Sequence, residues 1–267
     1  MFALVMVQAN AQSCCAKPTD MAAFVADVDF VRAHIEPLPY THVSTVGGET
    51  ITFSTPDGKT ASGYLIKSAK KSKKWLFVYQ EWWGLNDHIK KQAETFYNDL
   101  GDVNVLAIDL YDGKVATTRE DASKYMGESK TERTDAIIQG AVNYVGKKAK
   151  IASVGWCFGG GQSLRSALIE GKRAVGCIMY YGMPVQEVDK LKTLRCDVLG
   201  IFASREKWIS TAVVNEFEAN MKKAGKKVTV HNFDAEHAFA NPSNPNFDKK
   251  ASDEAYALSL AYLKKVY

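Results

Sequence analysis

The sequence lacks the features that would assign it to several broad classes of protein. It has no C-x-x-C motif, no arginine-rich arm, and no uncharged stretch near the roughly 20 residues that a membrane-spanning helix needs. Cysteine is scarce, with 5 in 267 residues, which excludes a disulfide scaffold. The 34 basic and 30 acidic residues give a net charge of only +4, so nothing calls for a nucleic-acid partner. The composition is that of a globular protein, and the near-neutral charge fits a small-molecule substrate.

The first residues resemble the end of an export signal. A short apolar run over residues 2–7 precedes Ala9-Asn10-Ala11, which is similar to a signal-peptidase site, although no basic segment comes before it. We therefore expect residues 1–12 to be a signal peptide whose first residues precede this sequence, and the protein to be periplasmic or secreted. The alternative is the frayed N-terminus of a cytoplasmic protein. Residues 13–48, with Cys14-Cys15, are expected to form an N-terminal extension.

From residue 49 onward, strand and helix patterns alternate. Residues 49–54 and 61–67 alternate in polarity around Thr55-Pro56-Asp57-Gly58, which predicts an antiparallel hairpin. Apolar runs predict buried strands, and these lie at 75–79, 103–110, 151–154, 174–180, 198–203 and 227–233. Helices are predicted over 87–100, 119–128, 131–147, from 158 onward, 211–224 and 249–266. The expected fold is a single α/β domain over 49–267, with a mainly parallel sheet, a leading antiparallel hairpin and helices on both faces.

The strongest chemical signal is Gly155-Trp156-Cys157-Phe158-Gly159-Gly160, between a predicted strand and a predicted helix. A nucleophile flanked by glycines at such a turn is typical of the nucleophile elbow of α/β-hydrolases. Side chains in place of the glycines would collide across the strained turn. The dipole of the helix that follows favours a thiolate. Cys157 is therefore the predicted nucleophile, and the alternative is a buried structural cysteine.

A cysteine nucleophile needs a base, and the base needs an acid that orients it. His237 follows the predicted strand 227–233, and the carboxyl ends of parallel strands share one edge of the sheet. Glu206 is the carboxylate in the turn after strand 198–203, between nucleophile and histidine in the chain. We expect His237 to be the base and Glu206 the acid.

Four segments together resemble the dienelactone hydrolase family. They are the glycine-flanked Cys157 segment, Gln80-Glu81-Trp82-Trp83-Gly84-Leu85-Asn86, Asp109-Leu110-Tyr111 and Glu236-His237-Ala238-Phe239. The resemblance implies an α/β-hydrolase fold and a Cys-His-Asp triad. Glu206 stands where the family usually has Asp, so this chain departs from the pattern by one methylene while keeping a carboxylate.

The resemblance also assigns roles around the nucleophile. Glu81 matches a glutamate that holds the resting thiol and changes partner when substrate binds. The backbone N–H groups of Trp82 and Phe158 then form the oxyanion hole.

The residues expected on the substrate side differ from the family pattern. Dienelactone-cleaving members hold the substrate carboxylate with arginines, but the matching stretches here contain Lys114 and Asn241. Lys114 offers charge without the two-pronged geometry of arginine, and Asn241 offers none. Trp83 and Trp208 are expected to line the pocket from loops at the catalytic edge. Dienelactone itself is therefore not the expected substrate.

These features predict a cysteine-dependent hydrolase of carboxylic esters or lactones that works through a thioester intermediate. We expect no cofactor, no metal, no nucleic acid and no membrane span, and a monomer or small homo-oligomer. Two alternatives stay open at this point. One is a catalytically inert binding protein with the hydrolase fold, and the other is a thiol redox protein.

Overall fold

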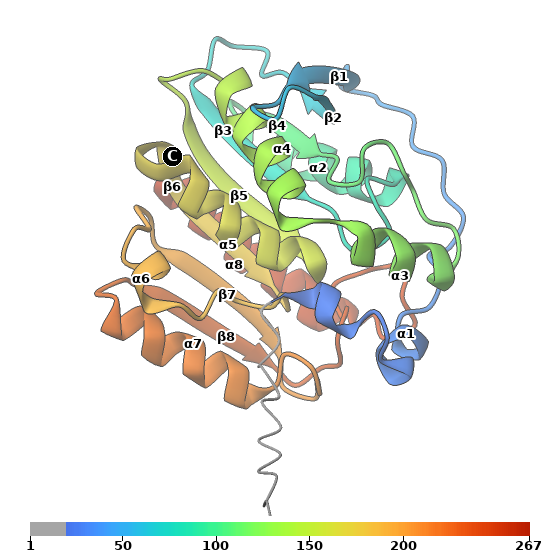
Figure 1. The fold of residues 1–267 in the computed structure, drawn as a ribbon. Coiled ribbons are helices and arrows are strands. Elements are labelled where there is room, and N and C mark those ends of the chain that lie inside the picture. Colours follow the sequence, from blue (N-terminus) through green and yellow to red (C-terminus); the bar gives the residue numbers. More distant parts are fainter. Residues whose placement is uncertain (1–19) are drawn as a thin grey trace, which may run out of the picture.

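A computed structural model of the chain describes residues 20–267 (Figure 1). The predicted signal peptide and Cys14-Cys15 lie outside the described residues. One eight-stranded sheet organises the fold. Its strands are β1 (Glu49–Ser54), β2 (Thr60–Ile66), β3 (Lys74–Tyr79), β4 (Asn104–Ile108), β5 (Lys150–Trp156), β6 (Ala174–Tyr180), β7 (Val198–Ala203) and β8 (Val228–Phe233).

The strand order is β1-β2-β4-β3-β5-β6-β7-β8. β1 pairs with β2, and β2 with β4, in antiparallel fashion, whereas the pairs from β4 through β8 are parallel. All five residues of β4 are buried, as are the last four of β3. These strands are covered on both faces, which explains their continuous apolar sequences. The predicted parallel sheet with a leading antiparallel hairpin is confirmed.

The α-helices are α1 (Val28–Ala33), α2 (Asp87–Leu100), α3 (Arg119–Glu128), α4 (Thr131–Tyr144), α5 (Phe158–Glu170), α6 (Val188–Leu191), α7 (Thr211–Lys223) and α8 (Lys249–Val266), with 3₁₀ turns η1 (Met21–Phe24) and η2 (Gly171–Arg173). α4 packs beside α5 on one face of the sheet, and α2 packs beside α8 on the other (Figure 1). Helices on both faces were expected and are confirmed. Between residues 20 and 267, no helix combines the length and apolarity needed to cross a membrane.

The N-terminal extension contains structure that the sequence patterns did not predict. The side chain of Asp27 caps α1 by accepting the N–H groups of Asp29 and Phe30. With only six residues, α1 is too short to show a helical period in the sequence. The extension is tied down at several points, including Trp208, whose indole N–H donates to Asp27 at 3.0 Å, and Asp87, which accepts the backbone N–H of His42 at 2.9 Å. It therefore lies against the loops that follow β7 and β3.

Candidate active site

Cys157 stands at the sharp turn between β5 and α5. Its φ of 55° and ψ of −120° are strained for a residue with a side chain. The turn is tight, because a Cβ on Gly155 would lie 2.1 Å from the carbonyl oxygen of Gly159, and a Cβ on Gly159 would lie 2.3 Å from that of Gln80. The steric reason expected for these glycines is confirmed. The backbone N–H of Cys157 donates to the backbone carbonyl oxygen of Tyr180 at 3.0 Å, which connects the turn to the end of β6.

The other two predicted triad residues reach the same edge of the sheet. His237 follows β8 and Glu206 follows β7, and both side chains are buried. Nδ1 of His237 lies 2.8 Å from Oε1 of Glu206, which also accepts the backbone N–H of Ile209 at 3.1 Å. The structure therefore brings together three residues that span 80 positions of the sequence, in the spatial order thiol, imidazole, carboxylate.

Charges inside the site couple the thiol to the imidazole. Burial favours a neutral His237, but the charges of Glu206 and Cys157 outweigh it and raise the pKa of His237 well above its ordinary value. Burial raises the pKa of the Cys157 thiol, although His237 and the N–H of Phe158 oppose the rise. The arrangement therefore stabilises an imidazolium once the thiol proton has moved to His237.

Glu81 follows β3 and is buried, as expected for a carboxylate with a polar partner. That partner is Asn241, whose side-chain amide donates to Oε2 of Glu81 at 2.6 Å. Burial raises the pKa of Glu81 to about 7, against the lowering effects of His237 and Asn241. No hydrogen bond joins Glu81 to the Cys157 thiol among the described residues; the sulfur lies 3.7 Å from Nε2 of His34.

The predicted oxyanion donors flank Cys157. Phe158 is the first residue of α5, so its N–H has no acceptor within the helix and lies close to the Cys157 sulfur. Trp82 lies in the turn that the N–H of Gly84 closes on the carbonyl oxygen of Glu81 at 3.4 Å. Both residues lie at the carboxyl edge of the sheet, after β3 and after β5 respectively.

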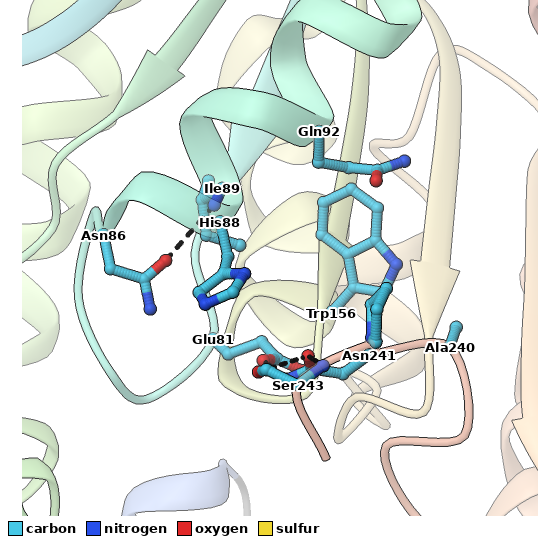
Figure 2. Close-up of a pocket in the computed structure, with 10 residues that line it drawn as sticks. Glu81, Asn86, His88, Ile89, Gln92, Trp156, Ala240, Asn241 and Ser243 are labelled. Carbon is cyan, nitrogen blue, oxygen red and sulfur yellow. Dashed lines mark hydrogen bonds between the residues drawn. The ribbon is translucent and has the colours of Figure 1, made fainter. Parts of the chain in front are cut away.

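A small pocket of about 40 Å³ opens beside Glu81 and Asn241 (Figure 2). The start of α2 and the loop after His237 form its walls, and Trp156 stands between them. The lining residues are Glu81, Asn86, His88, Ile89, Gln92, Trp156, Ala240, Asn241, Pro242 and Ser243. None of the ten is Lys or Arg. Asn241, expected on the substrate side, is thus a wall of this pocket.

The other residues expected on the substrate side are dispersed. Lys114 is half-exposed and pairs with Glu128 at 3.2 Å, so its charge is outside the pocket. Trp83 is buried with its ring centroid 5.0 Å from that of Trp82. Trp208 lies nearest the triad, with its ring edge-on to His237 at 6.5 Å between centroids.

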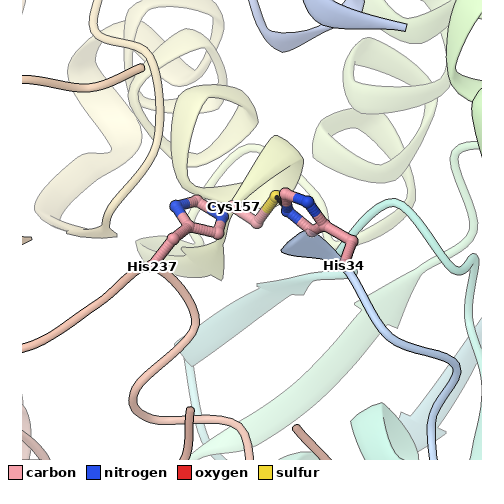
Figure 3. A group of neighbouring side chains, drawn as sticks. All are labelled: His34, Cys157 and His237. Carbon is pink, nitrogen blue, oxygen red and sulfur yellow. Dashed lines mark hydrogen bonds between the residues drawn. The ribbon is translucent and has the colours of Figure 1, made fainter. Parts of the chain in front are cut away.

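Two further residues near the thiol were not among the residues predicted from the sequence. His34 ends α1, and its Nε2 lies 3.7 Å from the Cys157 sulfur (Figure 3). Burial, followed by the charge of His237, lowers the pKa of His34 to about 3, so the ring is neutral. Phe30 is fully buried and contacts Trp82 and Trp208 edge-on. His34 lies against Cys157, which is 1% exposed, and Phe30 packs on His34 with ring centroids 4.1 Å apart; together they form the N-terminal cover of the site.

A local signal for this cover does exist in the sequence. Phe30 and His34 are four residues apart, a spacing that places both on one face of a helix, and Asp27 is a good N-cap. These features predict a helical turn that presents two aromatic rings. They do not indicate what the rings would contact.

Known proteins resemble this chain over most of its length. Residues 61–267 match the model of the dienelactone hydrolase family. The chain is 26% identical to Protein usf of Aquifex pyrophilus, over 82% of this chain and 98% of that protein. It is 22% identical to carboxymethylenebutenolidase 1 of Cupriavidus pinatubonensis, over 80% and 95% of the two chains.

Solved structures share the fold. The chain superposes with a TM-score of 0.71 on a dienelactone hydrolase-like promiscuous phosphotriesterase from metagenomic libraries, at 19% identity, covering 82% of this chain and 98% of that one. The family match begins in β2 and runs to the C-terminus. It therefore includes Glu81, Cys157, Glu206 and His237, but not the extension that carries Phe30 and His34.

Proposed function

The chain belongs to the dienelactone hydrolase family and is a hydrolase that acts on ester bonds, and we propose that it cleaves carboxylic esters or lactones through a thioester on Cys157. One observation carries the proposal. The side chains of Cys157, His237 and Glu206 converge in a buried site at the carboxyl edge of the sheet, with His237 and Glu206 2.8 Å apart. This is the arrangement that nucleophilic catalysis by a thiol requires.

The reaction proceeds in two halves. His237 accepts the thiol proton, and the thiolate attacks the ester carbonyl carbon. The N–H groups of Phe158 and Trp82 hold the oxyanion, and the C–O bond breaks as His237 returns its proton to the leaving alkoxide. A water molecule then gives a proton to His237 while its oxygen attacks the thioester. The Cys157 thiolate leaves and regains that proton, which restores the enzyme and releases a carboxylic acid.

Glu206 has a supporting role in both halves. Its carboxylate faces Nδ1 of His237, so the imidazole keeps its proton on Nδ1 and directs Nε2 towards the thiol. The negative charge of Glu206 also stabilises the imidazolium that forms in each half. The longer side chain of Glu, where the family usually has Asp, reaches the ring in this geometry.

The pocket favours substrates without a carboxylate. Its charged lining residue is Glu81, and Lys114, the basic residue expected to hold a substrate anion, is paired with Glu128 elsewhere. A negatively charged acyl group would therefore find no Lys or Arg in the lining, and ionised Glu81 would repel it. We propose uncharged esters or lactones as the substrate class, which agrees with the absence of the arginines expected for dienelactone binding.

Substrate access requires movement of the N-terminal cover. Cys157 is 1% exposed, and Phe30 and His34 lie over it. An ester carbonyl needs contact with the sulfur, so the residues of α1 must shift when substrate binds.

We also propose that the protein is exported, and this proposal depends on residues 1–12 alone.

Ester hydrolysis by matched variants tests the proposal. Wild-type protein should hydrolyse small aryl esters, and neutral esters better than those with a free carboxylate. Cys157→Ala and His237→Ala should each lower kcat/KM by 1000-fold or more, on the order of the loss seen when a nucleophile or its base is removed. Cys196→Ala removes a cysteine remote from the triad and should retain full activity. Equal, weak activity in all four proteins would favour the inert binding protein.

A further inference from the structure

Three potential metal ligands converge on one buried point. The ligand atoms of His34, Cys157 and His237 all lie within 4.8 Å of one another, and the three residues are buried. Figure 3 shows the Cys157 side chain between the two imidazole rings. His34 comes from the N-terminal extension and the other two residues from the catalytic domain, so the cluster is a product of tertiary structure.

The contacts behind the two rings indicate which nitrogen faces the sulfur. Nδ1 of His34 lies 2.7 Å from the carbonyl oxygen of Phe30, and since a carbonyl only accepts, Nδ1 carries the proton. Nδ1 of His237 faces Glu206 at 2.8 Å. Nε2 of each ring is then left for the centre of the cluster. Metal-binding histidines are oriented in this way, by a carboxylate or a backbone carbonyl at the second nitrogen.

Neither ring nitrogen of His237 has a well-aligned hydrogen-bond partner among the described residues, although the side chain is buried; Nδ1 has the close contact with Glu206, and the ring interacts with the Cys157 thiol. A buried polar atom without a partner is costly, and here it lies beside a second imidazole and a thiol. The thiol has one proton to give, so it can satisfy only one of the two rings at a time. A cation at the centre would satisfy both rings and the sulfur together.

We propose that His34, Cys157 and His237 form a binding site for Zn²⁺, with the fourth coordination position left to water or another small ligand. Zn²⁺ takes nitrogen and sulfur ligands in tetrahedral geometry, with Zn–S about 2.3 Å and Zn–N about 2.0 Å, which places neighbouring sulfur and nitrogen ligands about 3.5 Å apart. The sulfur of Cys157 lies 3.7 Å from Nε2 of His34. Small rotations of His237 complete the set.

The charges in the site also balance around a divalent cation. The Cys157 thiolate and the Glu206 carboxylate carry two negative charges, which one Zn²⁺ would neutralise. The three ligands and Glu206 are all buried, so solvent does not screen these charges. Three protein ligands with an open position are typical of exchangeable or catalytic zinc, whereas structural sites use four. Because the metal holds the nucleophilic sulfur, bound Zn²⁺ and an ester would compete for Cys157.

Metal binding without any ester tests the site directly. Protein with Cys14 and Cys15 replaced by serine would be titrated with Zn²⁺ against a chromophoric chelator. This parent protein, with His34, Cys157 and His237 intact, should bind one Zn²⁺ per chain. His34→Ala and Cys157→Ser should each weaken binding by about 100-fold or more, beyond the 10- to 100-fold typical of losing a residue that only orients a ligand. His231→Ala and Cys196→Ala, at a histidine and a cysteine outside the cluster, should bind as the parent does.

Co²⁺ supplies a spectroscopic check on the ligands. In the parent protein it should give the visible bands of a tetrahedral ion and near-ultraviolet charge transfer from sulfur, and the latter should vanish in Cys157→Ser. If His34→Ala does not fold, Zn²⁺ affinity is measured in His34→Gln instead, because Gln keeps a polar side chain of similar length. Absence of stoichiometric binding, or equal affinity in the parent and both His34 variants, would overturn the site. Ester hydrolysis is measured separately, in the presence of a chelator that removes Zn²⁺. The outcome of the metal titration therefore does not decide whether the protein is a cysteine-dependent esterase.

Discussion

Glu81→Gln separates the electrostatic cost of a buried carboxyl from any part it has in catalysis. Glu81 is buried, and its Oε2 accepts a hydrogen bond from Asn241. Burial raises its pKa from 4.5 to about 7, while His237 and Asn241 act in the opposite direction. Gln keeps a similar shape and an oxygen that accepts the Asn241 bond, but it has no proton to lose. The variant should therefore be more stable than the parent wherever the unfolded chain ionises Glu81.

The sign and the size follow from proton linkage. The folded chain holds the proton more tightly than the unfolded chain, so the stability from neutral Glu81 is full below pH 4.5 and is lost as the pH rises to 7. With one pKa unit equal to about 1.4 kcal/mol, the loss is about 1 kcal/mol at pH 5 and about 3 kcal/mol at pH 8. The free energy of unfolding of Glu81→Gln should exceed that of the parent by those amounts.

Urea unfolding at pH 5 and pH 8 measures the difference. At pH 8 the midpoint of Glu81→Gln should lie about 1 M above the parent midpoint, for an m-value of about 3 kcal/mol/M. Glu128→Gln is the matched control, since that carboxylate is half-exposed, and its stability should change by less than about 0.5 kcal/mol. An advantage of Glu81→Gln that is absent at pH 8, or that is the same at both pH values, would refute the reasoning.

Three further changes probe other parts of the structure. Burial raises the pKa of Glu170 to about 8 despite the hydroxyl of Ser166, so its stabilising neutral form is lost as the pH rises from 4.5 to 8. Glu170→Gln should thus raise the thermal midpoint by at least about 5 °C at pH 9 and leave it unchanged at pH 4; equal shifts would contradict this. Phe30→Ala removes a fully buried ring from the cover and should speed alkylation of Cys157 by iodoacetamide at least about 10-fold relative to Cys196, since such truncations cost about 3–5 kcal/mol of packing. Glu206→Gln should lower kcat/KM for aryl esters by about 100-fold or more without changing near-ultraviolet circular dichroism, and a loss below threefold would exclude the orienting role.

The parts of the fold that the sequence predicts are those determined by residues close together in the chain. The buried strands appear as apolar runs, and the turn at Cys157 appears in its glycines, because each constraint acts between residues close together in the chain. Chain order and strand position were enough to bring Glu206 and His237 to Cys157, since the ends of parallel strands share one edge.

The parts that were missed depend on contacts over long sequence distances. His34 and Cys157 are 123 residues apart, and α1 is held over the thiol by packing of Phe30 rather than by any helical period of its own. The partner of Glu81 was likewise beyond local reasoning, because Asn241 is 160 residues away. Burial of these side chains against one another, which no local pattern records, decides where they lie.

Trapping of the acyl-enzyme tests the central claim most directly. Protein mixed with an excess of an activated aryl ester and quenched in acid within the first turnover would be digested and analysed by mass spectrometry. We expect one acyl group per chain on the peptide containing Cys157, released by hydroxylamine, and none on that peptide in Cys157→Ala. Full turnover with no acyl group on Cys157, or with the group on another residue in both proteins, would contradict the cysteine mechanism.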